Sequence, residues 1–172
     1  LYVALPSRGR GQEDPVLSAY RDELCRAMTL LGQDPRTVFL GQAVAYPGTS
    51  MSSTLEGVPR DKLIELPVAE ELQMGQSIGM ALAGFVPVTI YPRWNFLLLA
   101  ANQIVNHLDK LPLISDYRPK VIIRVGIAAP EPLDPQWQHL GDFTDAFDLM
   151  CKTIDILKLD HSADIVQAYE FA

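Results

Sequence analysis

Short apolar runs alternate with helical patterns along most of this chain, and that alternation limits the folds open to it. Runs rich in aliphatic and β-branched residues predict strands at 37–40, 63–66, 86–91, 120–125 and 153–159. Apolar residues at helical spacing predict helices at 16–32, 69–83, 94–108, 142–151 and 162–171. Strands that are apolar throughout are typical of a parallel sheet covered on both faces. The sequence therefore predicts an α/β fold with a doubly wound, mostly parallel sheet and helices on both faces.

The length of 172 residues is that of one domain. Residues 1–15 mix glycine, proline and charge without periodicity and predict a loose N-terminal arm, so residues 16–172 are expected to form a single α/β domain. Residues 42–62 and 127–141 also lack periodicity and predict long loops. Loops of that length in a compact domain are usually functional or disordered.

Charge and composition exclude several classes of protein. The net charge is −7 and no basic run is present, which argues against nucleic acid or an anionic membrane as a partner. No apolar run approaches the ~20 residues of a membrane span, and no signal-peptide pattern follows Leu1, so a cytoplasmic protein is expected. Cys25 and Cys151 lie in amphipathic patterns, which predicts core thiols rather than a disulfide.

A carboxylate pair stands where a predicted strand meets a predicted helix. Strand 63–66 runs into Pro67, and Glu70 and Glu71 follow in the first helical turn, where negative charge is favoured. The carboxyl ends of strands are where α/β proteins bind ligands. One of these carboxylates could be a buried functional group, or the pair could be a solvated helix start; the spacing leaves both open.

The same predicted helix carries small residues every fourth position, at Gly75, Gly79 and Ala83. They give it a bare face, expected to lie opposite the larger residues Leu72, Met74, Ile78 and Leu82. Each glycine inside a helix costs about 1 kcal/mol relative to alanine, so the bare face indicates that another backbone packs closely. That backbone could belong to the same domain or to a partner subunit.

Familiar catalytic motifs are absent from the sequence. Neither a GxGxxG nor a GxxxxGK[ST] phosphate loop occurs, and there is no GxSxG elbow. The three histidines are dispersed without metal-ligand spacing, so no metal site is expected on this chain. His139, beside Trp137 in the loop 127–141, is either an exposed loop residue or part of a site.

Several segments together resemble the pyrimidine-binding domain of thiamine-diphosphate-dependent enzymes. The resemblance covers roughly residues 18–172 and is greatest to the beta subunit of the pyruvate (2-oxoacid) dehydrogenase decarboxylating component, with transketolases more distant. It is carried by residues 20–41, 48–49 with 55–57, 67–87, 94–106 and 154–168. Its most specific part is 67–70 with the glycine-bearing helix, combined with Asn95-Phe96 and the run 102–106.

The resemblance implies roles for four residues. Glu70 corresponds to the catalytic glutamate that hydrogen-bonds N1′ of the cofactor aminopyrimidine and activates it to form the C2 ylide. Phe96 corresponds to the aromatic residue that stacks on that ring, and Pro92 lies where the family places a residue near the pyrimidine. His139 corresponds to a loop histidine that reaches the substrate. Such a glutamate needs an apolar surrounding that favours its protonated form.

The resemblance also implies a partner chain. The family holds the diphosphate through Mg²⁺ with a Gly-Asp-Gly motif and a later Asn, whereas here Gly141-Asp142 continues with Phe143. An alpha-like, diphosphate-binding subunit is therefore expected to supply that half of the site, in a heterotetramer acting on a 2-oxo acid or sugar. The expected activity is that of a 2-oxoacid dehydrogenase. The alternatives are a transketolase-like transferase subunit and a non-catalytic assembly or regulatory subunit, because the 127–138 loop lacks the glycine-rich pattern of the family.

Overall fold

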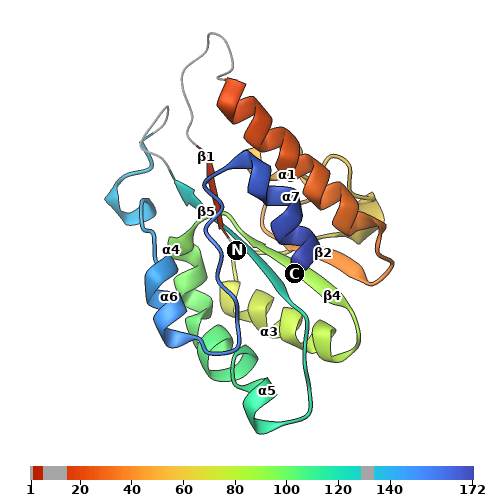
Figure 1. The fold of residues 1–172 in the computed structure, drawn as a ribbon, viewed down its shortest axis with the longest axis vertical. Coiled ribbons are helices and arrows are strands. Elements are labelled where there is room, and N and C mark those ends of the chain that lie inside the picture. Colours follow the sequence, from red (N-terminus) through yellow and green to blue (C-terminus); the bar gives the residue numbers. More distant parts are fainter. Residues whose placement is uncertain (1, 6–14, 129–133) are drawn as a thin grey trace.

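Five parallel strands form the centre of the molecule in the computed structural model, which describes residues 2–5, 15–128 and 134–172 (Figure 1). The sheet has the order β1-β5-β4-β2-β3, and every recorded pair is parallel. The strands are β1 (Tyr2–Leu5), β2 (Thr37–Gly41), β3 (Leu63–Glu65), β4 (Val86–Tyr91) and β5 (Ile122–Ala128). The predicted α/β fold with a parallel sheet is confirmed.

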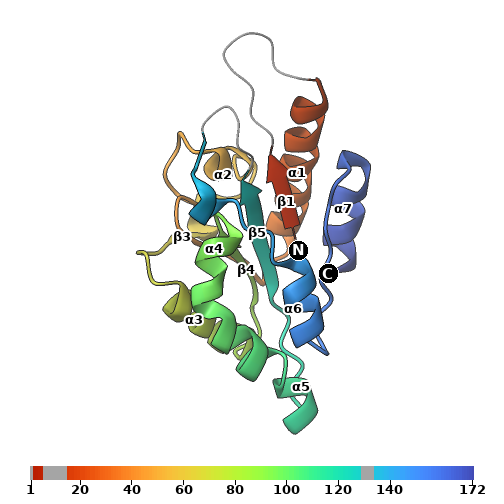
Figure 2. The same cartoon turned by 90° about the vertical axis from the view of Figure 1, so that its left-hand side faces the viewer.

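Helices cover both faces of this sheet. Helices α1 (Pro15–Gln33) and α7 (Ser162–Phe171) lie on one face, and α3 (Glu70–Leu82) and α4 (Trp94–Leu97) lie on the other (Figure 2). Helix α6 (Thr144–Met150) joins the α3 side through Phe147, which belongs to the same apolar cluster as Trp94. Short elements complete the chain: α2 (Ser50–Ser53), α5 (Leu111–Ile114), 3-10 turns at Arg60–Lys62, Leu98–Ala100 and Trp137–His139, and a π-helix at Gln103–Leu108.

Two apolar cores result, one on each side of the sheet. Strand β4 is buried over its whole length, and its side chains alternate between the two cores, as the pleat of a strand requires. Val88 packs with Leu24 of α1 on the α1 and α7 side, whereas Tyr91 packs with Met74 of α3 on the other. A strand buried on both faces explains why the run 86–91 is apolar almost throughout.

The predicted strand at 153–159 is wrong, because none of these residues pairs with the sheet. Instead the carboxylate of Asp109 accepts the backbone N–H groups of Lys152 and Thr153, both at 2.7 Å. Ile154 and Ile156 still bury part of their surface against the core on the α3 side. The alternating apolar pattern of 153–159 therefore indicates a half-buried extended segment and not a hydrogen-bonded strand.

Two further elements differ from the prediction. Residues 2–5, expected as part of a loose arm, form β1 and pair with β5 in the register Tyr2↔Val125; the rest of that arm lies outside the described residues. The helix predicted at 94–108 is broken into α4, a 3-10 turn and the π-helix. Leu98 and Leu99 in the 3-10 turn are 41% and 63% exposed, because no other described element covers them.

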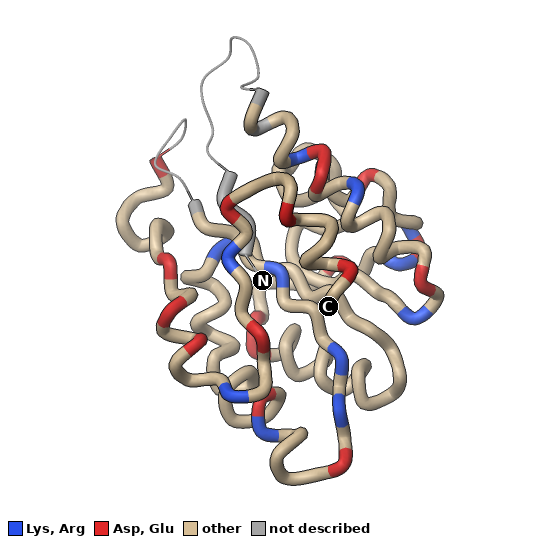
Figure 3. The backbone as a smooth tube through the Cα atoms, in the orientation of Figure 1, with Lys and Arg blue, Asp and Glu red and all other residues tan. Residues whose placement is uncertain are grey.

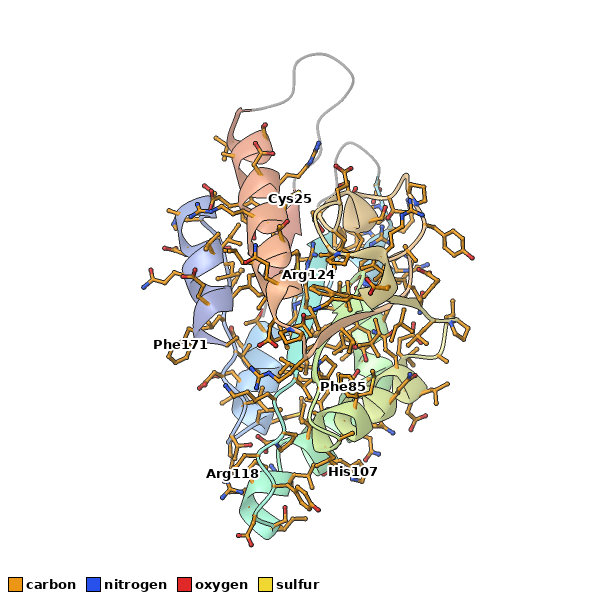
Figure 4. The ribbon with its side chains drawn as sticks, turned by 90° about the vertical axis from the view of Figure 1, so that its right-hand side faces the viewer. Cys25, Phe85, His107, Arg118, Arg124 and Phe171 are labelled. Carbon is orange, nitrogen blue, oxygen red and sulfur yellow. The ribbon has the colours of Figure 1, made fainter. Side chains whose placement is uncertain are left out.

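The charged residues and the two cysteines are arranged as the composition predicts, with mixed charges and no disulfide. Lysine and arginine are interleaved with aspartate and glutamate along the chain (Figure 3). Both cysteines are free, as predicted; Cys25 (Figure 4) is half-buried and donates to the Ser53 carbonyl, and Cys151 is buried. Burial raises the pKa of both thiols. No helix within the described residues is long and apolar enough to cross a membrane.

Asp109 provides a test of how the 151–159 segment is held. Its side chain is buried, and burial alone would raise its pKa, but hydrogen bonds from Lys110, Thr153 and Lys152 outweigh that effect and lower the pKa to about 2. Because the folded pKa lies below the unfolded value of about 3.9, the stabilisation is present above pH 4 and is lost as the pH falls towards 2.

We therefore expect Asp109→Asn to lower the free energy of unfolding at pH 7 by about 2 kcal/mol, since one pKa unit corresponds to about 1.4 kcal/mol. Urea unfolding at several pH values between 2 and 7 measures this, and the variant should lose less stability than the parent as the pH falls. Asp116→Asn, at an exposed position, is the matched control. A pH dependence that is the same in parent and Asp109→Asn would contradict the assignment.

Candidate functional site

The strand order reverses between β2 and β4. From β2 the chain adds β3 on one side, and it then returns to add β4 on the other side of β2. In open α/β sheets, ligands bind outside the carboxyl ends of the strands at such a reversal. Gln42 follows β2, Glu70 begins the helix after β3, and Pro92 follows β4, so three segments meet at this edge of the sheet.

Glu70 is buried at this edge, with 3% of its surface exposed. Its Oε1 accepts a hydrogen bond from Gln42 Nε2 at 3.2 Å, and its backbone carbonyl accepts one from the Tyr91 hydroxyl at 3.3 Å. Glu71 is exposed and accepts from Gln103 Nε2 at 2.9 Å. Of the two carboxylates, Glu70 is therefore the one withdrawn from water.

The first turn of α3 is fixed to the sheet by a buried glutamine. Gln73 Nε2 donates to Thr89 Oγ1 at 2.9 Å and to the Ile90 carbonyl at 3.0 Å, which ties the helix to β4. Burial raises the pKa of Tyr91, so its hydroxyl remains a donor at neutral pH. These contacts determine where Glu70 stands relative to the ends of β2 and β4.

The turn after β2 is held by a second carboxylate, that of Glu65 at the end of β3. Its two oxygens accept the backbone N–H groups of Ala43, Val44 and Ala45 at 2.7, 2.9 and 2.8 Å. Ala43 has a φ of 58°, a conformation that non-glycine residues rarely adopt and that the three bonds stabilise. At Gly41 any Cβ would lie 2.3 Å from the Ile90 carbonyl oxygen, so only glycine fits there.

The rings of Phe96 and His139 meet, although they are 43 residues apart in the chain, with centroids 5.5 Å apart and planes inclined at 55°. Asn95 Oδ1 accepts the Gly141 N–H at 3.3 Å and so fixes the 137–141 turn to α4. His139 Nδ1 lies 2.8 Å from the Pro135 carbonyl. A carbonyl only accepts, so Nδ1 carries the proton, and Nε2 of the neutral ring is left as an acceptor.

The structure thus brings the predicted residues together in two groups. Phe96 and His139 are in direct ring contact, whereas the hydrogen-bond partners of Glu70 are Gln42 and Tyr91. Pro92 is half-buried between β4 and α4. Within the described residues, no group of three histidine, cysteine, aspartate or glutamate side chains could hold a metal ion.

The bare face of α3 is a solvent-facing stripe, and its predicted relation to the larger side chains is partly wrong. Met74 and Ile78 are buried, but Leu72 is 60% and Leu82 43% exposed, on the same side as the glycines. A Cβ at Gly75 or Gly79 would meet no atom within 4 Å. We call residues 68, 72, 75, 79 and 82 the α3 stripe; Val68 at its start is 78% exposed, and Phe85 beyond its end is also exposed (Figure 4).

Comparison with known proteins adds independent information. No protein-family model matches the chain. It is 32% identical over 63% of its length to the pyruvate dehydrogenase E1 component subunit beta of Chaetosphaeridium globosum. It is 30% identical over 70% of its length to the chloroplastic subunit beta-4 of Oryza sativa subsp. japonica, and 34% identical over 46% to the 3-methyl-2-oxobutanoate dehydrogenase subunit beta of Mycobacterium tuberculosis.

The chain is a relative of the 2-oxoacid dehydrogenase E1 beta subunits. The resemblance predicted from the sequence is confirmed at that level. The matches cover 34%, 31% and 24% of those three relatives, so the chain spans about a third of the length of the curated relatives that it matches.

For this E1 beta relative, sequence reasoning missed the residues that hold the site in place. Gln42, Glu65 and Asn95 act through contacts between segments that are 20 or more positions apart. The one available signal was a polar residue at the end of a strand: Gln42 directly follows β2, and Glu65 is the last residue of β3. Nothing in the spacing indicated which partner each would meet.

We expect Glu65→Ala to release the turn after β2. Three backbone N–H groups lose their acceptor, and each buried donor left unpaired costs about 1–3 kcal/mol. Hydrogen exchange followed by NMR should show faster exchange at Ala43, Val44 and Ala45. The exposed Glu71→Ala is the matched control, and equal exchange rates in both variants would show that Glu65 does not hold the turn.

Proposed function

We propose that the chain is the pyrimidine-binding part of a thiamine-diphosphate-dependent 2-oxoacid dehydrogenase, active with an alpha-like partner chain. The observation that carries the proposal is Glu70, a carboxylate buried at the β2–β4 reversal whose hydrogen-bond partner among the described residues is an amide and not a cation. A buried carboxylic acid free of a cationic partner fits the ring nitrogen of an aminopyrimidine, with which it can share a proton.

The residues present fit one end of this cofactor. Phe96 is half-buried and offers a ring face, and Pro92 adds an apolar wall after β4. The Mg²⁺ and diphosphate site is assigned to the partner chain because Gly141-Asp142 continues here with Phe143 instead of glycine. When bound, thiamine diphosphate supplies the carbanion chemistry, and the protein supplies orientation and proton transfer.

Four side chains of this chain then have separate roles in binding and proton transfer. Glu70 exchanges a proton with N1′ of the pyrimidine, and its burial excludes competing water. Gln73 and Tyr91 hold the first turn of α3 so that the carboxyl is fixed before the cofactor binds. His139 Nε2 is available to accept a proton from the substrate, a 2-oxo acid.

The α3 stripe supports the requirement for a partner. Its positions within α3, residues 72, 75, 79 and 82, are spaced three and four apart, which is the spacing that one helix presents to another. Two glycines at its centre allow a second backbone to approach closely, and exposed Leu72 and Leu82 flank them. We infer that a helix of the alpha-like subunit packs here, within a heterotetramer.

A cytoplasmic location remains a prediction, since one relative is named as chloroplastic.

Replacing Glu70 with glutamine tests the catalytic proposal. The change keeps the size of the side chain but removes the exchangeable proton, and general acid–base groups contribute about 10²- to 10⁴-fold. We expect 2-oxo acid decarboxylation by the chain co-purified with its alpha-like partner to fall at least ~100-fold. Glu71→Gln is the matched control and should retain activity.

The result also separates the alternative functions. Wild-type turnover with a ketose donor but not with a 2-oxo acid would indicate a transketolase-like transferase. Absence of turnover with any such donor in the complete complex would indicate an assembly or regulatory subunit. Full activity of Glu70→Gln would exclude the proposed role of this residue.

The partner surface gives a separate prediction. Gly79→Leu should leave the isolated chain folded, because a Cβ at this position meets nothing within 4 Å, but it should block the close approach of a second helix. We expect co-purification with the alpha-like chain to be lost, as measured by size-exclusion chromatography. Asp160→Leu adds the same side chain at an exposed position before α7 and is the control. Normal assembly of Gly79→Leu would rule out this surface.

A further inference from the structure

Gln42 is the side chain that contacts the carboxyl of Glu70, at 3.2 Å between Nε2 and Oε1. It stands directly after Gly41, whose position against the Ile90 carbonyl admits no side chain. It directly precedes the turn in which Glu65 binds three successive N–H groups. The backbone on both sides of Gln42 is therefore fixed, and its amide is directed at Glu70.

A glutamine amide can serve either protonation state of a neighbouring carboxyl. Its NH₂ group donates to a carboxylate, and after a half-turn about its last torsion its oxygen accepts from a carboxylic acid O–H. A buried polar group left without a partner costs about 1–3 kcal/mol. An apolar residue at position 42 would leave both states of Glu70 without this partner, and a lysine or arginine would favour the carboxylate alone.

The other ionisable groups near Glu70 cannot pair with both protonation states of its carboxyl. The Tyr91 hydroxyl donates to the backbone carbonyl of Glu70, and burial keeps it protonated. The oxygens of Glu65 are occupied by the backbone of the turn after β2. Glu71 faces solvent and binds Gln103. Among the contacts that the described residues make, Gln42 is thus the one able to follow a change in the charge of Glu70.

We propose that Gln42 is a positioning residue that pairs with Glu70 in both protonation states, so that the carboxyl can give up and regain a proton without losing its partner. The proton moves from the Glu70 carboxyl to the pyrimidine nitrogen and returns along the same path, and no electrons are transferred. This inference rests on the proposed function for its catalytic consequence, but the pairing itself belongs to the chain alone.

The pairing is tested first without cofactor, in the chain labelled with ¹³C at the glutamate carboxyls. Followed by NMR against pH, the titration midpoint of Glu70 should be about one pH unit higher in Gln42→Leu than in the parent, because both protonation states lose a hydrogen bond but the one to the charged carboxylate is about twice as strong. Gln42→Glu should raise it further, because two adjacent carboxyls cannot both ionise readily. Gln76→Leu, a half-buried glutamine elsewhere on α3, should leave it unchanged.

Backbone chemical shifts of residues 43–45 verify that each variant keeps the turn after β2. An unchanged Glu70 midpoint in Gln42→Leu with that turn intact would overturn the proposal.

In the complete complex, Gln42→Leu should lower kcat about 10-fold, leave the KM for thiamine diphosphate within 2-fold, and shift the pH profile upward by the same amount as the NMR midpoint. A larger effect on KM than on kcat would mean that Gln42 acts in cofactor binding and would overturn the positioning role. If Glu70→Gln retains turnover while the NMR shift is present, the proposed function fails and the Gln42–Glu70 pairing stands.

Discussion

The buried carboxyl of Glu70 is the constraint around which this edge of the molecule is built. A carboxyl withdrawn from water needs fixed polar partners, because nothing mobile can replace the lost hydration. Gln42, in the turn after β2, supplies the hydrogen bond to the carboxyl, while contacts from the end of β4 and the first turn of α3 hold the backbone at Glu70 in place. Each supporting contact, from Glu65 to Gln73, serves to keep those three segments in register at the point where the strand order reverses.

The opposite side of α3 is a helix face that no described element covers. Glycines in a helix reduce its intrinsic stability, and here no atom of the described chain uses the space that they leave. The exposed leucines of the α3 stripe and the exposed Leu98 and Leu99 belong to the same side of the sheet. The proposed function joins these two features, the buried carboxyl and the uncovered helix face, as one half of a site shared with a partner chain.

Much of the fold was accessible from local patterns, and the errors are informative. Strands β2 to β5 and the principal helices follow from apolar periodicity, because burial on two faces demands it. The segment 153–159 has the same alternation but no ladder, since Asp109 captures its first backbone groups. Leu72 and Leu82 were assigned to the wrong side of their helix, because the face of α3 that is buried is decided by where Gln73 and Met74 meet the sheet.

The sequence by itself determined the parallel α/β architecture and the resemblance to the E1 beta subunits, which pointed to Glu70 as a candidate, because these depend on residue type and short-range spacing. Only the tertiary structure decided that Glu70 rather than Glu71 is buried, that Gln42 is its partner, and that His139 meets Phe96. Such pairings join residues that are 28 to 43 positions apart, and their geometry is set by how the strands align rather than by any local preference.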